Sequence, residues 1–319
     1  MARKPRNEQI DPHRTCWYHF TSRCIVKMHR LSDANNERKD MLLNHIKSLN
    51  AAFSLDIAAF AIMASHAHIV IRLNPDAHLQ WTDQEMVERW AIIHPPRNTH
   101  NQPIEDEQRY QRWVQDRLND SKWLEQTREK LASPSQFMKD FKQFAAQTFN
   151  KLDQTVGHFW ESRFRSIPLD DREAVLATMA YVDLNPFAAK LCDVPEQGEF
   201  TSLKERVESR QQEIIEPAET SNESSTDQTN PALNASAERH VWFAAIDESA
   251  TNQAGDPGLF RGIRLDSYLK LVDGVARMVR NGKHHLDTNA EGILTRLKLC
   301  NRTFQDCFAR VCYRMQFVT

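Results

Sequence analysis

The chain has 319 residues and a mass of 37.1 kDa, which suggests about two domains. Only 8 residues are Gly, which argues against glycine-rich nucleotide-binding folds and β-propellers. No apolar run approaches the ~18 residues of a membrane-spanning helix, and residues 1–10 lack an apolar signal segment. The 6 Cys residues include no Cys-x-x-Cys pair, which excludes a zinc ribbon and disfavours a disulfide framework. We therefore expect a soluble, cytoplasmic protein with no membrane partner.

The charge is unevenly distributed along the chain. The formal net charge is −2, yet residues 261–319 contain eleven Lys or Arg against five Asp or Glu. Residues 203–240 contain four basic and eight acidic residues. A basic C-terminal segment binds nucleic acid in some proteins and is only a solvated helical surface in others, so the charge alone leaves both interpretations open.

Composition predicts three parts. Residues 216–231 contain almost no side chain that can be buried, which is typical of a disordered segment. We predict a domain over residues 1–205, an acidic, polar, disordered linker over 206–240, and a small basic helical module over 241–319.

Hydrophobic periodicity predicts the elements of the first domain in chain order. We expect a strand at 16–22, a helix at 36–49, paired strands within 57–73, helices at 82–93, 105–131 and 134–150, a strand or hairpin at 157–168, and a helix from 171 to 184 that Pro186 ends.

This order predicts an α+β fold. We expect one antiparallel sheet with helices on one face, interrupted by an α-helical insertion at about 79–150. In the C-terminal module, an apolar stripe predicts a helix that begins near Asp266; its members are Leu269, Val272, Ala276 and Val279.

Two histidines mark the second of the paired strands. His66 and His68 are two positions apart, so on a strand both imidazoles point to the same face and can reach one divalent ion or one phosphate. We expect that face to be open. The alternative is a pair of polar side chains on a solvated strand.

A tyrosine and an asparagine share one face of the last predicted helix. Tyr181 and Asn185 are four residues apart, and Asn185 precedes Pro186. They could therefore address one point in space. The alternatives are a tyrosine that packs in the core and an asparagine that only caps the helix.

Taken together and in this order, four segments resemble the single-tyrosine HUH transposases, and among them the REP-associated tyrosine transposase-like group. The segments are 18–24 (YHFTSRC), 61–71 (AIMASHAHIVI), 157–166 (GHFWESRFRS) and 181–186 (YVDLNP). The resemblance covers about residues 16–191, interrupted at 79–131, and residues 259–279 resemble the tail of longer members.

The resemblance implies a ferredoxin- or RRM-like sheet and a metal-dependent reaction. It implies that His66, His68 and Asn185 bind Mg²⁺ or Mn²⁺ and that Tyr181 is the nucleophile, forming a 5′-phosphotyrosine link. It also implies single-stranded or hairpin DNA as the partner and a homodimer as the active species.

Three positions depart from the family's pattern. Ser65 stands where the family usually has Asn, and Ala67 is small where a bulky apolar residue is usual. Residues 187–190 read FAAK, so Ala188 replaces the family's arginine. The loss of that arginine bears on how firmly the protein holds DNA.

Further residues are candidates for DNA contacts. Phosphates would be bound by Arg23, Arg72, Arg163 and Arg165, and a base would stack on Trp160 or Phe159. For Trp160 the alternative is core packing.

The leading hypothesis is a metal-dependent DNA transposase or strand transferase. A DNA-binding regulator on the same fold that does not cleave is the first alternative. A replication-initiation-type nickase is the second.

Overall fold

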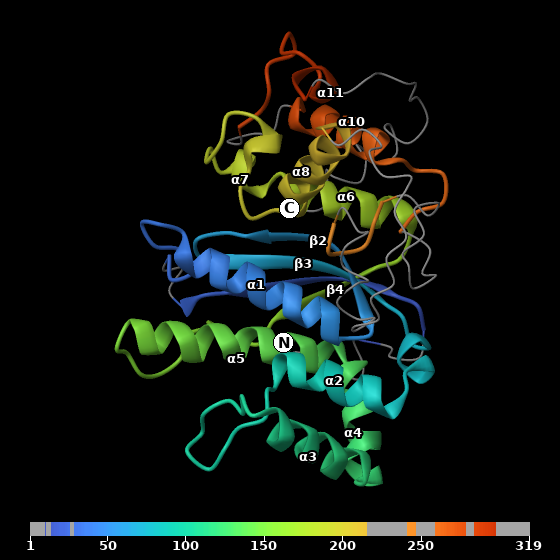
Figure 1. The fold of residues 1–319 in the computed structure, drawn as a ribbon. Coiled ribbons are helices and arrows are strands. Elements are labelled where there is room, and N and C mark those ends of the chain that lie inside the picture. Colours follow the sequence, from blue (N-terminus) through green and yellow to red (C-terminus); the bar gives the residue numbers. More distant parts are fainter. Residues whose placement is uncertain are drawn as a thin grey trace, which may run out of the picture. The chain divides into compact units, whose positions relative to one another are not determined.

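The computed structural model describes residues 10, 14–25, 29–215, 241–246, 259–278 and 284–297. These residues form two compact units, coloured along the sequence in Figure 1. Unit 1 comprises Met1–Asp56, Ala64–His66 and Ile71–Pro168. Unit 2 comprises Ile57–Met63, Ala67–Val70 and Leu169–Thr319.

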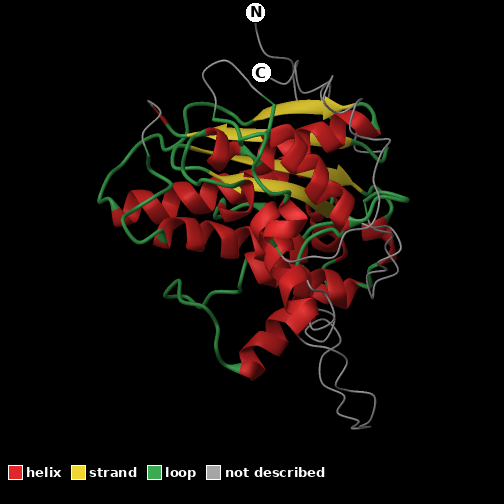
Figure 2. Ribbon diagram, turned by 90° about the horizontal axis from the view of Figure 1, so that it is seen from above, coloured by secondary structure: helices red, strands yellow, loops and turns green. Residues whose placement is uncertain are grey.

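A four-stranded sheet runs in the order β2-β3-β1-β4, and its strands are drawn in yellow in Figure 2. The strands are β1 (Trp17–Arg23), β2 (Leu55–Ile62), β3 (His66–Leu73) and β4 (Arg165–Leu169). The Cys24 amide donates to the Ser65 carbonyl at 2.9 Å, and the Leu73 amide donates to the Cys16 carbonyl at 2.8 Å. These two bonds make β1 and β3 antiparallel. The prediction of an α+β fold with one antiparallel sheet is confirmed.

Two helices of unit 1, α1 (Glu37–Ala52) and α5 (Pro134–Leu152), lie side by side (Figure 1). Ser133 caps α5 by accepting a hydrogen bond from the Gln136 amide, and Pro134 occupies the first turn, which suits proline. Residues spaced by four bury one stripe of α5, namely Phe137, Phe141, Ala145 and Phe149. This stripe builds the apolar core of unit 1.

The insertion contains η3 (Ala77–Gln80), α2 (Asp83–Ile93), α3 (Glu107–Leu118) and α4 (Ser121–Leu131). The prediction of one helix over 105–131 is wrong, because the chain breaks at Asn119 and Asp120. The Asp120 side chain accepts a hydrogen bond from the Trp123 amide at 3.0 Å and so begins α4. Asn and Asp favour such caps over helix interiors.

Unit 2 contains α6 (Arg172–Asp183), α7 (Asn185–Ala188), η4 (Pro195–Gln197), α8 (Ser202–Ile215), α10 (Leu265–Ala276) and α11 (Ile293–Arg296). Asp171 caps α6, with its side chain accepting from the Ala174 amide at 2.8 Å. Pro186 does not end helical structure, since it lies in the first turn of α7. α8 extends to Ile215, into the predicted linker, whose residues 216–240 lie outside the described residues.

The outer edge of β2 is covered by the segment that leads into α8. The Phe60 amide donates to Ser202 Oγ at 3.1 Å, and the Ile62 amide donates to the Phe200 carbonyl at 3.0 Å. Phe200 has a φ of 57°, a left-handed conformation that is strained for a bulky residue. These bonds satisfy two amides that an exposed edge strand would offer to another chain.

β2 and β3 are buried on both faces over most of their length. Side chains alternate between the two faces of a strand, yet the consecutive residues Ile57–Ile62 are all buried, and so are residues 67–71. Burial of both alternating sets means that both faces are covered. The face that carries His68 is therefore not open, which corrects the expectation for that strand.

The described part of the C-terminal segment, here residues 241–319, belongs to unit 2. α10 begins at Leu265, as its apolar stripe predicted, and it buries Tyr268, Leu269 and Val272 completely. Phe243 packs its ring against the Phe60 ring of β2, with centroids 5.7 Å apart. Val279 lies outside the described residues. None of the helices described is long and apolar enough to span a bilayer.

We expect the C-terminal segment to stabilise the rest of unit 2. Leu269→Ala removes a fully buried side chain from α10 and should lower the free energy of unfolding by about 2–5 kcal/mol. Deletion of residues 231–319 should lower it further, because it also removes Phe243 and Tyr268 from the core. Chemical denaturation measures both effects. Arg264→Ala, at an exposed position, is the matched control; an equal loss in this variant would contradict the assignment.

Candidate functional site

Tyr181 is the point at which the second half of α6 reaches solvent. From Val175 to Leu184 every residue of the chain is buried except Tyr181, which is half-buried. A helix that is apolar on all sides is normally enclosed by its neighbours. Tyr181 is therefore not fully enclosed, as a tyrosine packed in the core, the alternative considered from the sequence, would be.

His68 of β3 meets Tyr181 within unit 2. The two ring centroids are 5.8 Å apart and the ring planes lie at 89°, which is an edge-to-face contact. His68 is only 4% exposed. The structure therefore brings together two predicted site residues that are far apart in the sequence.

Asn185 lies one turn beyond Tyr181, at the junction of α6 and α7. Its Nδ2 donates to the Tyr181 carbonyl at 2.9 Å and to the Val182 carbonyl at 3.3 Å. Asn185 thus acts as a cap, one of the two roles considered from the sequence. Because both partners are acceptors, the amide nitrogen must face the helix end, and Oδ1 points away from it.

His66, at the start of β3, lies in unit 1 beside Ser65 and Arg23. Ser65 Oγ is 3.1 Å from His66 Nδ1, and the β1–β3 register places Arg23 opposite His66. The pKa of His66 is lowered to about 4, chiefly by burial and to a smaller extent by the charge of Arg23. His66 is therefore neutral at pH 7, the form in which imidazole binds a metal.

A third histidine lies on the same face of β1 as Arg23. His19 is 4% exposed, and its Nε2 is 3.4 Å from Thr21 Oγ1. Burial lowers its pKa to about 4, with a smaller contribution from the charge of Arg165. Sequence reasoning missed His19. The sequence shows that His19, Thr21 and Arg23 alternate on one face of a strand, but only the pairing of β1 with β3 places that face beside His66.

The predicted DNA-contacting arginines have different surroundings. Arg23, Arg163 and Arg165 are exposed. Arg72 is half-buried; its Nε donates to Asp56 at 2.8 Å, and its guanidinium lies 5.7 Å from the Trp17 ring centroid. Three of the four arginines are thus placed where an anion in solution can reach them.

Trp160 is integrated into unit 1. Its Nε1 donates to the Lys142 carbonyl at 2.8 Å, and its ring centroid lies 5.0 Å from that of Phe159 and 6.0 Å from that of Phe141. These are the contacts of the packing alternative considered from the sequence.

The side chains of His66, His68 and Asn185 have the donor types of a weakly held hard cation. Among the described residues, no group of three or more His, Cys, Asp or Glu side chains could hold a metal ion. His66 and His68 alternate onto one face of β3, and Oδ1 of Asn185 is an oxygen donor of the kind that Mg²⁺ and Mn²⁺ accept. In chemical type, two imidazoles and one amide suit such an ion when phosphate oxygens complete its coordination; His66 lies in unit 1, and His68 and Asn185 lie in unit 2.

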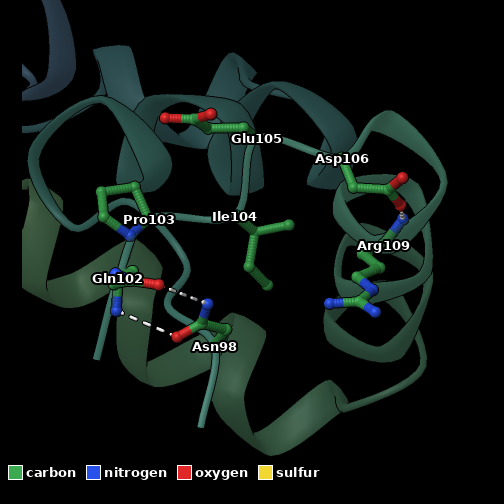
Figure 3. Close-up of a pocket in the computed structure, with 7 residues that line it drawn as sticks. All are labelled: Asn98, Gln102, Pro103, Ile104, Glu105, Asp106 and Arg109. Carbon is green, nitrogen blue, oxygen red and sulfur yellow. Dashed lines mark hydrogen bonds between the residues drawn. The ribbon is translucent and has the colours of Figure 1, made fainter. Parts of the chain in front are cut away.

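A surface pocket with a volume of about 470 Å³ lies elsewhere in unit 1, in the loop that leads into α3 (Figure 3). None of the predicted site residues lines it. Its lining residues are Asn98, Gln102, Pro103, Ile104, Glu105, Asp106 and Arg109.

Comparison with protein-family models and with curated proteins found no match. The chain is similar to a solved structure described as the REP-associated tyrosine transposase bound to a REP hairpin. The sequence identity is 11% and the TM-score 0.32, over 68% of this chain and 93% of that chain. At these values the likeness fixes neither the fold nor the activity of this chain.

The buried histidines predict a loss of stability in mild acid. His19 and His45 are neutral when folded, each with a pKa lowered to about 4, chiefly by burial. The unfolded chain binds these protons near pH 6.5, so stability present above that pH is lost as the pH falls toward 4. For His19 the loss is on the order of 3 kcal/mol.

Urea unfolding at pH 7 and pH 5 tests this expectation. His19→Gln cannot take up the proton, so its stability should change less between the two pH values than that of the wild type. His158→Gln, at an exposed position, should follow the wild type. An identical pH dependence in His19→Gln and the wild type would contradict the prediction.

Proposed function

We propose that this protein cleaves and rejoins single-stranded or hairpin DNA, as a transposase or strand transferase with Tyr181 as its nucleophile. The observation that carries the proposal is the edge-to-face contact of Tyr181 with His68, 5.8 Å between centroids. Tyr181 is half-buried near a helix end whose neighbouring residues are enclosed, so a rigid element holds its side chain and part of the residue reaches the surface. Rigid placement of a nucleophile supplies the orientation that a displacement reaction requires.

The reaction conserves phosphoester bonds. The phenolic oxygen of Tyr181 bonds to phosphorus, and the bond from phosphorus to the 3′ oxygen breaks. The phenol loses its proton, and the leaving 3′ oxygen takes up a proton to become a hydroxyl. The DNA is then joined to the protein through a 5′-phosphotyrosine. Attack by a 3′ hydroxyl reverses the step, so rejoining requires no external energy source.

His66, His68 and Asn185 would hold the divalent metal, Mg²⁺ or Mn²⁺. A bound ion would neutralise charge on the scissile phosphate. The neutral state of His66 and the outward Oδ1 of Asn185 support this assignment. Since Asn185 also caps α6, it would tie the position of its oxygen to that of Tyr181.

The exposed arginines Arg23, Arg163 and Arg165 are the best placed of the predicted phosphate contacts. Arg72 and Trp160 would have to exchange their present partners in order to bind DNA. The strand order β2-β3-β1-β4 supports a ferredoxin-like sheet as the finer description of the fold. A homodimer stays a prediction.

Tyr181→Phe tests the nucleophile. The substitution removes one oxygen and keeps the ring against His68, so the variant should bind a labelled hairpin DNA as the wild type does and form no covalent adduct. A denaturing gel detects the adduct, and peptide mapping should locate it on Tyr181.

Tyr110→Phe is the matched control, because Tyr110 lies on α3 in unit 1, and this variant should form the adduct normally. Cleavage by Tyr181→Phe would refute the proposal. A wild type that binds the hairpin with metal present and never cuts it would favour the non-cleaving regulator.

The metal has a test that does not depend on cleavage. Electron paramagnetic resonance should detect Mn²⁺ binding to the wild type in the presence of single-stranded DNA. His68→Ala should weaken this binding at least about tenfold, because one of only two imidazole donors is lost. His158→Ala should leave it unchanged, and a chelator should abolish adduct formation. Full cleavage in the presence of chelator would remove the metal from the mechanism.

A further inference from the structure

The carboxylate of Asp183, two residues after Tyr181, is completely buried and accepts three hydrogen bonds. Oδ1 accepts from Ser202 Oγ and from the Leu203 amide, the latter at 2.9 Å. Oδ2 accepts from the Tyr268 hydroxyl at 2.6 Å. These donors come from the start of α8 and from α10. A buried carboxylate cannot exchange such donors for water, so the three bonds fix the end of α6.

Asp183 and Tyr181 lie on opposite sides of the helix. Residues two apart are separated by about 200° around a helix, whereas Tyr181 and Asn185 share a face. Holding Asp183 against α8 and α10 therefore turns Tyr181 away from that interior and toward His68. The rotation of α6 about its own axis is determined on the face opposite the proposed nucleophile.

The donors are themselves held in place. Ser202 is positioned by the strained Phe200 and accepts a hydrogen bond from the Phe60 amide of β2. Tyr268 is fully buried, and its ring centroid lies 5.7 Å from the guanidinium of Arg206. Arg206 in turn donates to the Ala58 carbonyl at 2.8 Å and to the Ala244 carbonyl at 3.1 Å. Tyr268 thus cannot move without disturbing β2 and residues 241–246.

We propose that Tyr268 is a positioning residue for Tyr181: through its hydrogen bond to Asp183, the C-terminal segment sets the orientation in which α6 presents the nucleophile to His68. The inference rests on the proposed function for its catalytic consequence. It assigns to α10 a role in the reaction itself, beyond its contribution to the core.

The test uses the full chain labelled with 3-fluorotyrosine. The ¹⁹F resonance of Tyr181 is identified by its absence in Tyr181→Phe. Tyr268→Phe removes only the hydroxyl that binds Asp183, and it should shift or broaden the Tyr181 resonance, as His68→Ala does. Tyr110→Phe should leave that resonance unchanged. An unaltered Tyr181 resonance in Tyr268→Phe would overturn the inference.

The rate of adduct formation at saturating DNA supplies the catalytic readout. Tyr268→Phe should slow it on the order of tenfold while DNA affinity stays within about twofold, because orientation and not binding is lost. If Tyr268 acts through Asp183, the double variant Asp183→Asn/Tyr268→Phe should be no slower than Asp183→Asn alone. Independent, multiplicative effects would contradict this route.

Two further outcomes are distinguishable. If the wild type forms no adduct, the proposed function fails, while the ¹⁹F comparison still decides whether Tyr268 orients Tyr181. If Tyr268→Phe does not fold, Ser202→Ala replaces it, because it removes another donor from the same carboxylate; an unchanged Tyr181 resonance in that variant would likewise overturn the inference.

Discussion

The packing of unit 2 depends on the carboxylate of Asp183, which is completely buried. Burial raises the pKa of Asp183, and the charge of Arg206 together with the hydrogen bonds from Ser202, Tyr268 and the Leu203 amide acts in the opposite direction. A charged group can stay in such a place only if donors surround it. The need to supply them brings the start of α8 and α10 to the end of α6. Arg206 extends the same network to β2 and residues 241–246 through its bonds to two carbonyls.

This interior has a consequence for the exposed side of α6. With Asp183 fixed and the surrounding residues enclosed, the helix has one half-buried position near its end, and that position is Tyr181. Asn185 continues the order across the junction with α7 by capping the carbonyls of Tyr181 and Val182. A side chain on such a framework has little orientational freedom left to lose, which is the property that the proposed role of Tyr181 requires.

In unit 1, two guanidinium groups act on neutral imidazoles instead of pairing with carboxylates. Arg23 is opposite His66, and the charge of Arg165 acts on His19; both histidines are kept neutral at pH 7. Neither arginine forms an ion pair with a carboxylate among the described residues, in contrast to Arg72 with Asp56. A sheet surface with uncompensated guanidinium groups suits an anionic partner such as a phosphodiester backbone.

The sequence by itself determined the local elements and the chemistry-bearing residues. Apolar periodicity predicted the strands, α1, α5, α6 and α10, and spacing placed His66 with His68 and Tyr181 with Asn185, because these patterns depend on backbone geometry within one element. Tertiary structure alone decided that His68 and Tyr181 meet, that the face of β1 with His19 and Arg23 lies beside His66 of β3, and that Asp183 binds Tyr268 from α10. Tertiary structure also buried both faces of β2 and β3. The alternation of apolar and polar residues in the sequence could not predict this, because the buried residues include Ala as well as larger apolar side chains. Contacts between distant segments follow from strand register and from the satisfaction of buried polar groups, and neither is written in the spacing of one segment.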